Sequence, residues 1–222
     1  MGEAPYTPDL FGRADCMAPW NETVTEGVVH LHHYALAKER ELAAAIKSVI
    51  HVSPLRHMVT PGGFRMSVST SSCGQAGWIT DGAGYRYSSR DPLTGKAWPE
   101  MPALFMQLAQ SAANEAGYPD FLPDSCLINR YRPGTKMSLH QDKDERNLGQ
   151  PIVSISLGLP AIFQFGGDER SDKTQRIALM HGDVFVWGGV SRLKYHGILP
   201  LKEGSHPIFG ANRFNLTFRR AR

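Results

Sequence analysis

The sequence predicts a fold of the α+β class that is mainly β, in which a double-stranded β-helix, or jelly roll, carries flanking helices. After Pro123 the chain breaks into eight short candidate strands punctuated by Pro and Gly, which is typical of a jelly roll. Before Pro123, two segments repeat apolar residues at helical spacing. With 222 residues, 41% of them hydrophobic, the chain suits one domain with a sizeable core.

Composition argues against several classes of protein. No apolar run approaches the roughly 20 residues needed to cross a membrane, and the N-terminus does not have the pattern of a signal peptide. The cysteines Cys16, Cys73 and Cys126 form no C-x-x-C motif, so we expect neither a zinc ribbon nor a disulfide framework. A reducing cytoplasm fits this pattern best.

Charge is unevenly distributed along the chain. Residues 1–27 hold five acids and one base, whereas the remainder carries 23 bases and 16 acids. A basic body is compatible with a phosphate-bearing partner. An ordinary solvated surface explains the charge equally well.

Residues 1–26 are expected to form an irregular N-terminal arm, because they are rich in Pro, Asp and Glu and show little periodicity. Residues 27–222 are expected to form a single domain, with helices in residues 27–122 and the jelly-roll core in residues 123–222. The elements expected before Pro123 are strands over 28–34 and 64–73 and helices over 38–52 and 102–116. Pro54 ends the first helix, and Gly117 is a stop signal for the second.

Three histidines lie on the first predicted strand. His32 and His33 are adjacent, so their side chains point to opposite faces and cannot chelate one ion together. His30 and His32 can share a face, but the sequence shows no carboxylate placed to join them. We therefore do not predict a metal site here.

A long loop is predicted over residues 74–99, which are rich in Gly, Ser, Asp and aromatic residues. Loops of this length tend to be functional or disordered. Its aromatic side chains could stack on a flat ligand or fold inward and anchor the loop, and the residues alone favour the second interpretation. The four are Trp78, Tyr85, Tyr87 and Trp98.

The strands predicted for the second half alternate with turn residues. They span residues 126–131, 136–140, 152–157, 161–165, 176–179, 183–187, 193–196 and 214–219.

Two His-x-Asp triplets occur in this half. His181-Gly-Asp183 lies between two apolar strands, so we interpret it as a hairpin turn that Asp183 caps. His140-Gln-Asp142 instead closes a strand and opens a long charged loop. Side chains two apart on a strand share a face, so His140 and Asp142 can reach one ion together. With His196 they would complete the two-histidine, one-carboxylate set that binds non-haem Fe(II), which predicts an iron oxygenase.

The C-terminal strand alternates without a fault. Phe214, Leu216 and Phe218 take one face; the opposite face carries Arg213, Asn215, Thr217 and Arg219. Two arginines inside a barrel need anions, and a dicarboxylate would supply one to each. A solvated edge strand is the simpler alternative, but it explains the strict alternation less well. Asn129 and Tyr131 share this spacing on an earlier strand and could donate to the same dicarboxylate.

At these motifs the chain resembles the AlkB-type dioxygenases, a family that repairs alkylated nucleic acid. The resemblance covers the chain from about Gly27 to the C-terminus. It rests on Asn129-Arg-Tyr131, His140-Gln-Asp142-Lys-Asp144-Glu, the run from Pro151 to Gly167, Trp187-Gly-Gly with Tyr195-His196-Gly197, and Arg213-x-Asn215-Leu-Thr-Phe-Arg219.

The resemblance implies a ligand set for the cofactors. Fe(II) would be bound by His140, Asp142 and His196. The co-substrate 2-oxoglutarate would be held through its two carboxylates by Arg213 and Arg219, with help from Asn129, Tyr131, Asn215 and Thr217.

It also implies an N-terminal nucleotide-recognition lid over a substrate site. Trp78 would stack on a flipped base against His196, Tyr85 would belong to the lid, and Met66 would lie on the lid strand. Asp144, counted with the catalytic residues, would accept a hydrogen bond from the exocyclic amine of the base. The remaining implied contacts are Arg170 at the base pocket and Thr60, Lys136 and Gln141 on the nucleic-acid backbone. Thr70 stands where the bacterial relatives have a bulkier methionine.

The activity implied is oxidative dealkylation of bases such as 1-methyladenine and 3-methylcytosine in single-stranded DNA or RNA, with double-stranded DNA as a further expected partner. O2 would be consumed, 2-oxoglutarate would become succinate and CO2, and an aldehyde would leave. A monomer in the cytoplasm is expected. Two alternatives stay open: an Fe(II)- and 2-oxoglutarate-dependent oxygenase that acts on protein or another modified RNA, and a non-enzymatic jelly-roll binding module.

Overall fold

The computed structural model describes residues 18–222, so residues 1–17 of the predicted arm lie outside the described residues. Its strands are, in chain order, β1 (Trp20–Thr25), β2 (Val28–His32), β3 (Ser69–Gly74), β4 (Gly77–Asp81), β5 (Gly84–Ser88), β6 (Ser125–Tyr131), β7 (Met137–His140), β8 (Ile152–Gly158), β9 (Ala161–Phe165), β10 (Gln175–Leu179), β11 (Val184–Trp187), β12 (His196–Ile198) and β13 (Arg213–Arg219). The helices are α1 (Glu39–Val52) and α2 (Ala103–Glu115), with the short 3-10 helices η2 (Leu36–Lys38) and η3 (Gly189–Ser191).

Two antiparallel sheets form the body of the molecule. One has the strand order β1-β2-β11-β8-β13-β6-β3 and the other the order β10-β9-β12-β7. Val28, Ile152 and Phe185 of the first sheet pack with Phe163 and Ile177 of the second, so an apolar core fills part of the space between them. This arrangement confirms the predicted jelly roll and the mainly β fold class.

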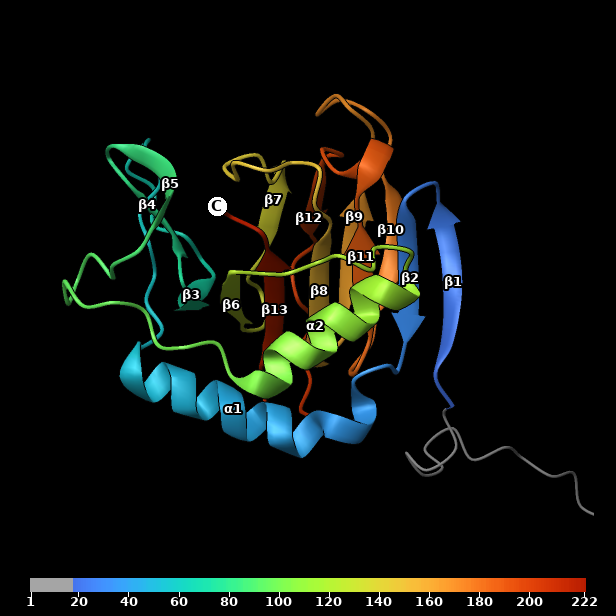
Figure 1. The fold of residues 1–222 in the computed structure, drawn as a ribbon, viewed down its shortest axis with the longest axis horizontal. Helices are drawn as coiled ribbons and strands as arrows, with labels where there is room; N and C mark the ends of the chain where they lie inside the picture. Colours follow the sequence, from blue (N-terminus) through green and yellow to red (C-terminus); the bar gives the residue numbers. More distant parts are fainter. Residues whose placement is uncertain (1–17) are drawn as a thin grey trace, which may run out of the picture.

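The two helices cross the other face of the larger sheet (Figure 1). Leu42 and Ile46 of α1 and Phe105 of α2 are buried there against Ile128 and Leu216. Each helix therefore buries the apolar stripe that its spacing predicted. Both predicted helices are confirmed, with ends within two residues of the expected positions.

The side chains of strand β13 point alternately to the two faces of this sheet. Its apolar residues Leu216 and Phe218 belong to the core beneath the helices. Its alternate residues, including the buried Arg213 and Arg219, face the space between the two sheets and line a cavity there. The alternative of a solvated edge strand is wrong, because β13 pairs with β6 on one side and β8 on the other.

Three predictions for the first half need correction. Trp20–Thr25, placed in the irregular arm, forms strand β1 against β2. The predicted loop over residues 74–99 contains a hairpin, in which β4 pairs with β5. Gly84 begins β5 at a φ of +114°, a conformation that glycine adopts without strain. The strand predicted over residues 64–73 is confined to Ser69–Gly74.

Two predictions for the second half also change. Residues 181–183 form a turn, and Asp183 caps it by accepting from the Met180 N–H at 2.7 Å. The turn is not a hairpin, because β10 pairs with β9 whereas β11 pairs with β2 and β8. The strand expected over residues 193–196 begins only at His196, after η3.

None of the helices found in residues 18–222 is both long enough and apolar enough to cross a membrane.

Candidate active site

A cavity of about 570 Å³ opens between the two sheets, beneath the β4–β5 hairpin. Its volume lies in the range of small-molecule sites. Every residue for which the sequence predicted a site role lines it: Thr60, Met66, Trp78, Tyr85, Asn129, Tyr131, Lys136, His140, Gln141, Asp142, Asp144, Arg170, His196, Arg213, Asn215, Thr217 and Arg219. The structure thus brings together residues spread over about 160 positions of the chain.

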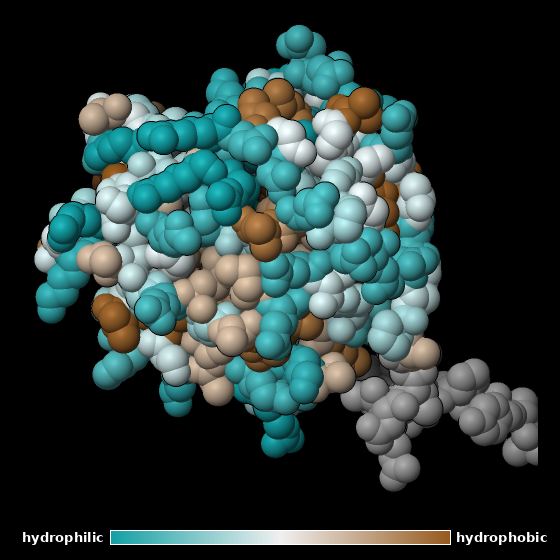
Figure 2. Space-filling model, in the orientation of Figure 1, coloured by the Kyte–Doolittle hydropathy of each residue, from teal (hydrophilic) through white to brown (hydrophobic). Residues whose placement is uncertain are grey.

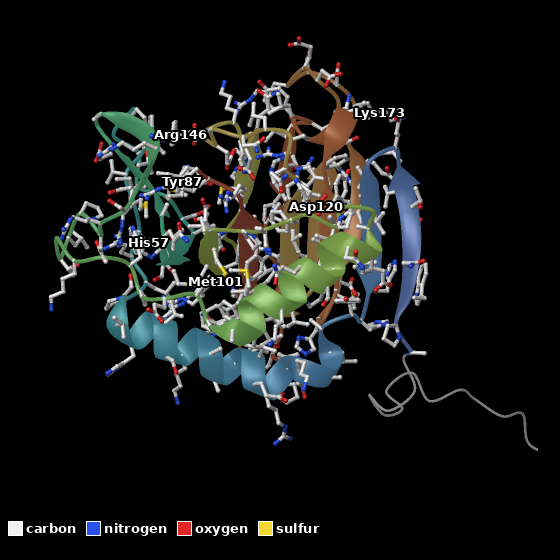
Figure 3. All side chains as sticks on the ribbon, viewed as in Figure 1. His57, Tyr87, Met101, Asp120, Arg146 and Lys173 are labelled. Atoms are coloured by element: carbon white, nitrogen blue, oxygen red, sulfur yellow. The ribbon has the colours of Figure 1, made fainter. Side chains whose placement is uncertain are left out.

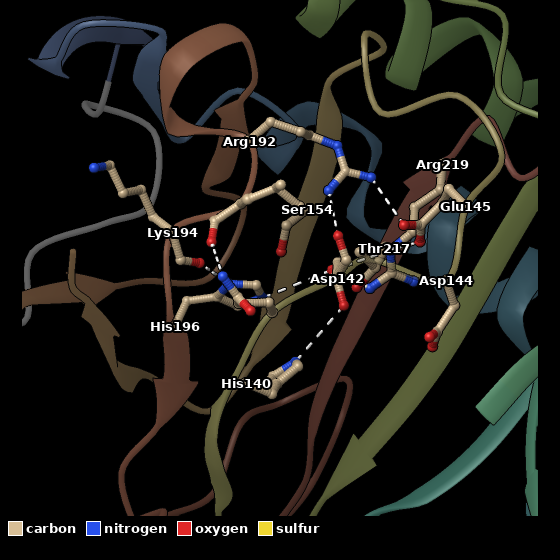
Figure 4. Close-up of polar contacts among 12 residues, drawn as sticks. His140, Asp142, Asp144, Glu145, Ser154, Arg192, Lys194, His196, Thr217 and Arg219 are labelled. Carbon is tan, nitrogen blue, oxygen red and sulfur yellow. Dashed lines mark hydrogen bonds and ion pairs between the residues drawn. The ribbon is translucent and has the colours of Figure 1, made fainter. Parts of the chain in front are cut away.

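His140, Asp142 and His196 meet at one point of this cavity (Figure 4). His140 ends β7 and His196 begins β12, and the two are cross-strand partners. The Nε2 atoms of His140 and His196 each lie 3.7 Å from an oxygen of Asp142. One ligand atom from each residue lies within 4.8 Å of the other two, so the three can share one ion.

Backbone carbonyls fix which nitrogen of each imidazole carries the proton. Nδ1 of His140 lies 2.9 Å from the Ser138 carbonyl, and Nδ1 of His196 lies 2.9 Å from the Lys194 carbonyl. Because a carbonyl only accepts, each Nδ1 donates and each Nε2 keeps its lone pair toward Asp142. Desolvation, together with the neighbouring His196, lowers the pKa of His140 to about 4. The ring is therefore neutral at neutral pH, as a metal ligand must be.

Two neutral imidazoles and one carboxylate fit Fe(II). Burial opposes the charge on Asp142, yet Arg219 and the two imidazoles hold the pKa of its carboxyl well below the usual range. His140 and Asp142 are thus in the protonation state that binds a divalent ion. The triad takes three positions and leaves the others open to ligands from the cavity.

Arg213 is the most deeply buried of the charged residues that line the cavity. Its side chain is among the largest that are fully buried, and burial lowers its pKa. Nη2 donates to Ser156 Oγ at 3.0 Å, but Nε and Nη1 have no hydrogen-bond partner in the part of the chain that the structure describes. A buried guanidinium with two unused donors requires an anion. A carboxylate of 2-oxoglutarate fits this requirement.

Arg219, six residues along the same strand, is already paired. Its Nε and Nη2 donate to Asp142 Oδ2 at 3.0 and 2.5 Å, and its Nε lies 3.3 Å from Glu145 Oε1. The prediction that Arg213 and Arg219 each hold one carboxylate of 2-oxoglutarate stays a prediction. The structure shows an unused donor pair only at Arg213.

Amides and hydroxyls also line this cavity. Asn215 Nδ2 donates to Ser154 Oγ at 2.7 Å, and Thr217 Oγ1 donates to Asn215 Oδ1 at 2.8 Å. Asn129 Oδ1 is buried and has no partner among the described residues. The Tyr131 ring lies beneath Arg213, 5.0 Å from its guanidinium carbon.

Sequence reasoning missed a buried network around Glu145. Its carboxylate accepts from Tyr87 Oη at 2.7 Å and Arg192 Nη2 at 3.0 Å, and it also faces Arg219. Figure 3 shows Tyr87 on the hairpin, on the side toward the sheets. The network thus joins the hairpin, the loop after β7 and β13. The acidic cluster from Asp142 to Glu145 was visible, but nothing in the sequence placed Arg192 or Tyr87 beside it.

Arg192 also holds the loop that follows the metal-ligand strand. Its Nη1 donates to the Asp142 carbonyl at 2.6 Å and its Nε to the Gln150 carbonyl at 2.9 Å. One side chain therefore fixes both ends of the loop (Figure 4 shows its contacts with Asp142 and Glu145). The position of Asp142 depends on this arrangement.

Aromatic and acidic groups face one another at the mouth of the cavity. Trp78 Nε1 donates to Asp144 Oδ2 at 2.8 Å, and the Trp78 and Tyr85 rings stack at 5.7 Å between centroids. Both aromatic side chains line the cavity, so the interpretation of these two as inward anchors is wrong. Trp98 is buried and does anchor the loop, through a bond to the Ser88 carbonyl.

Polar residues around the mouth have varied partners. Gln141 Nε2 donates to the Leu193 carbonyl at 2.7 Å, Arg170 Nη2 donates to the Leu139 carbonyl, and Thr60 Oγ1 accepts from the Phe64 N–H at 3.2 Å. Thr70 is fully buried on β3, opposite Asn129, and is not among the residues that line the cavity.

Comparisons with known proteins agree with this geometry. A sequence profile of the 2OG-Fe(II) oxygenase superfamily matches residues 27–219. The chain is 57% identical over 213 residues to the Alpha-ketoglutarate-dependent dioxygenase AlkB of Escherichia coli (strain K12), covering 96% of this chain and 97% of that protein. It is 41% identical to an AlkB homolog of Caulobacter vibrioides, covering 84% of each. The solved structure of OsALKBH1 matches with a TM-score of 0.80 at 27% identity, covering 90% of this chain and 99% of that chain.

Proposed function

The chain belongs to the 2OG-Fe(II) oxygenase superfamily, and we propose that its substrates are N-alkylated bases of the 1-methyladenine and 3-methylcytosine type in single-stranded nucleic acid. It is an AlkB-type dioxygenase that dealkylates nucleic acid and uses Fe(II), 2-oxoglutarate and O2. One observation supports the substrate class most strongly. A metal triad and a buried arginine, which has two donors without partners among residues 18–222, share a cavity whose mouth presents an indole ring and a carboxylate.

His140, Asp142 and His196 would hold Fe(II). With 2-oxoglutarate, the iron supplies activation of O2, so that 2-oxoglutarate becomes succinate and CO2 and the alkyl carbon is hydroxylated and leaves as an aldehyde. Arg213 would bind the carboxylate of 2-oxoglutarate that lies farther from the metal, because its free donors lie six residues along β13 from Arg219, which bonds Asp142. Arg219 would keep Asp142 ionised and oriented through the two bonds between them.

At the mouth, the structure suggests how a damaged base is selected. Bases such as 1-methyladenine and 3-methylcytosine are flat and positively charged. Trp78 offers a π face, which attracts a cation, and Asp144 offers a negative charge and a hydrogen-bond acceptor. Both groups favour the alkylated base over its neutral parent.

Single-stranded substrates are expected to react best. The base must leave its stack to enter the cavity, at a cost of a few kcal/mol that is least for single strands and damaged pairs. Hydrophilic side chains gather around the hairpin side of the molecule (Figure 2), and Lys136 and Arg170 line the cavity there. We propose that Lys136 contacts the phosphates and that Arg170 lies at the base pocket. One chain supplies the whole site, so we also propose that the enzyme acts as a monomer; its cytoplasmic location stays a prediction.

Repair of a defined oligonucleotide tests this function. The purified chain would be incubated in air with Fe(II), ascorbate, 2-oxoglutarate and a short single strand that carries one 3-methylcytosine, and mass spectrometry would follow the oligonucleotide. Loss of one methyl group, abolished by His140→Ala, is the expected result. Succinate without demethylation would retain the oxygenase and discard the substrate.

Asp144→Asn isolates the charge at the mouth. Asparagine keeps an acceptor for the Trp78 indole but removes the carboxylate, so the cationic base loses a charge-assisted bond worth about 1.5–3 kcal/mol. We expect demethylation of 3-methylcytosine to fall about 10- to 100-fold in kcat/KM. The dissociation constant for 2-oxoglutarate should not change. Equal losses in both quantities would contradict the role given to Asp144.

A further inference from the structure

Among residues 18–222, the structure gathers metal-ligand side chains in three places. One is the catalytic triad; the other two are Glu22, His30 and His32, and Glu39, His181 and His206. Proximity alone does not make a site, because an imidazole binds a metal only through a nitrogen that keeps its lone pair. The hydrogen bond made by the other ring nitrogen decides which one that is.

The group around Glu39 does not pass this test. Nδ1 of His181 accepts from the Gly158 N–H at 3.0 Å, and Nδ1 of His206 accepts from the Ile208 N–H at 3.2 Å. In each neutral ring the proton is therefore on Nε2. For His181 that proton is donated to Glu39 Oε2 at 2.9 Å. These residues form a hydrogen-bonded structural cluster.

His30, in the group around Glu22, also carries its proton on Nε2 but differs at Nδ1, to which no described residue donates a hydrogen bond. Its Nε2 lies 2.9 Å from Asp183 Oδ2, and Asp183 also accepts from the backbone N–H groups of His33 and Met180. A carboxylate that is ionised and fixed in this way draws the imidazole proton to Nε2, which leaves the Nδ1 lone pair free. Carboxylate–histidine pairs of this kind commonly support metal ligands.

His32 presents a nitrogen without a partner. Nε2 is buried, and no described residue makes a hydrogen bond to it; Glu22 Oε2 is 3.5 Å away. Trp20 stacks on the ring at 3.7 Å between centroids and 9° between planes, which holds its orientation.

Strand β1 supplies the carboxylate that the sequence did not reveal. Glu22 is the cross-strand partner of His30 on β2, so the prediction that no carboxylate joins these histidines is wrong. The Glu22 side chain is 51% exposed, which leaves a path from solvent to the group. β1 and β2 lie at the edge of the larger sheet opposite to β3 and the hairpin (Figure 1), away from the cavity mouth.

We propose that Glu22, His30 and His32 form a second metal site, for a borderline divalent cation such as Zn²⁺, that ties the edge strand β1 to β2. Two imidazoles and one carboxylate are a known ligand set for Zn²⁺, which accepts a water as its fourth ligand. The ligands carry one negative charge in total, so they complement a dication.

Binding requires a small movement of the two rings. The His30 and His32 rings are 3.7 Å apart at 32°, whereas the catalytic pair His140 and His196 is 4.5 Å apart at 53°. The first pair must open toward the second geometry before both lone pairs meet one ion. We therefore expect the edge site to bind Zn²⁺ more weakly than the catalytic site.

Zinc content after equilibrium dialysis of the full chain against Zn²⁺ tests the proposal. The wild-type chain should retain two ions, one at each site. His32→Asn should retain one, and so should His140→Ala, which removes the catalytic ion instead. The double variant should retain none. His33→Asn is the matched control and should retain two: it changes the adjacent histidine, whose φ of 56° asparagine tolerates.

A second readout separates loss of binding from loss of folding. In the His140→Ala background, Zn²⁺ should raise the thermal unfolding midpoint, because an ion that binds only the folded chain stabilises it. Glu22→Gln, a change at an exposed strand position, should remove most of that shift. Retention of both ions by His32→Asn, or of a single ion by the wild-type chain, would overturn the second site without affecting the proposed repair activity.

Discussion

The two arginines of β13 occupy similar positions and have opposite surroundings. Arg213 and Arg219 are 1% and 5% exposed and face the same cavity. Arg219 is paired with Asp142 and Glu145 through Nε and Nη2, whereas Arg213 keeps two donors without partners among the described residues. The difference separates a structural role, held by Arg219, from a ligand-binding role, which we assign to Arg213. Burial is similar and charge is the same in the two cases, so the partners separate them.

The largest effect is expected at Arg213, which has no anion beside it among the described residues. Arg213→Met removes the guanidinium but keeps a long side chain, so bound 2-oxoglutarate would leave a carboxylate buried and unpaired, at about 3–5 kcal/mol. We expect its dissociation constant to rise about 100- to 5,000-fold, measured by calorimetry with a redox-inert metal. The unfolding free energy without 2-oxoglutarate should change little. A large decrease in the unfolding free energy of Arg213→Met without 2-oxoglutarate would show that Arg213, like Arg219, has a structural role.

Around Arg219, a substitution should mainly change the free energy of unfolding. Glu145→Gln removes a buried anion shared by Arg192, Arg219 and Tyr87, which should lower the unfolding free energy by about 3 kcal/mol. Denaturant unfolding without 2-oxoglutarate measures this, and Glu203→Gln at an exposed position is the control. If Glu145→Gln unfolds like the control but binds 2-oxoglutarate 100-fold more weakly, the roles of Arg213 and Arg219 have been assigned the wrong way round.

The smallest effect is expected for Ser156→Ala, which tests how the Arg213 guanidinium is oriented. Ser156→Ala removes the one hydrogen bond that Arg213 donates through Nη2, worth about 0.5–1.5 kcal/mol. The guanidinium then loses orientation but keeps its charge. We expect the dissociation constant of 2-oxoglutarate to rise about threefold to tenfold in the same calorimetric assay. A change as large as that of Arg213→Met would mean that orientation, rather than charge, holds the carboxylate.

The sequence predicted the parts of the fold that depend on local patterns. The alternation from Arg213 to Arg219 predicted both the core face and the cavity face of β13, because a strand places successive side chains on opposite faces. The spacing of Leu42, Ile46 and Val49 predicted the buried stripe of α1 in the same way. The shared position of His140 and Asp142 also followed from short-range spacing.

Contacts between distant segments were not accessible in this way. Glu22 joins His30 only because β1 pairs with β2, and the polar residues of β1 gave no periodic signal. Arg192 reaches Glu145 from 47 positions along the chain, and Tyr87 does so from 58. Such partners depend on topology, and a single sequence does not display pairings between remote elements.

Arg192 has a consequence for how this enzyme can diverge. Because its guanidinium binds the carbonyls of Asp142 and Gln150, both ends of the intervening loop are held independently of the loop's tip. The tip, residues 146–149, is exposed. Insertions, deletions and substitutions there need not displace the metal ligand. Variation in loop length among descendants of this chain should therefore concentrate at residues 146–149, next to the cavity mouth, where it could change which nucleic acids are accepted while the chemistry is preserved.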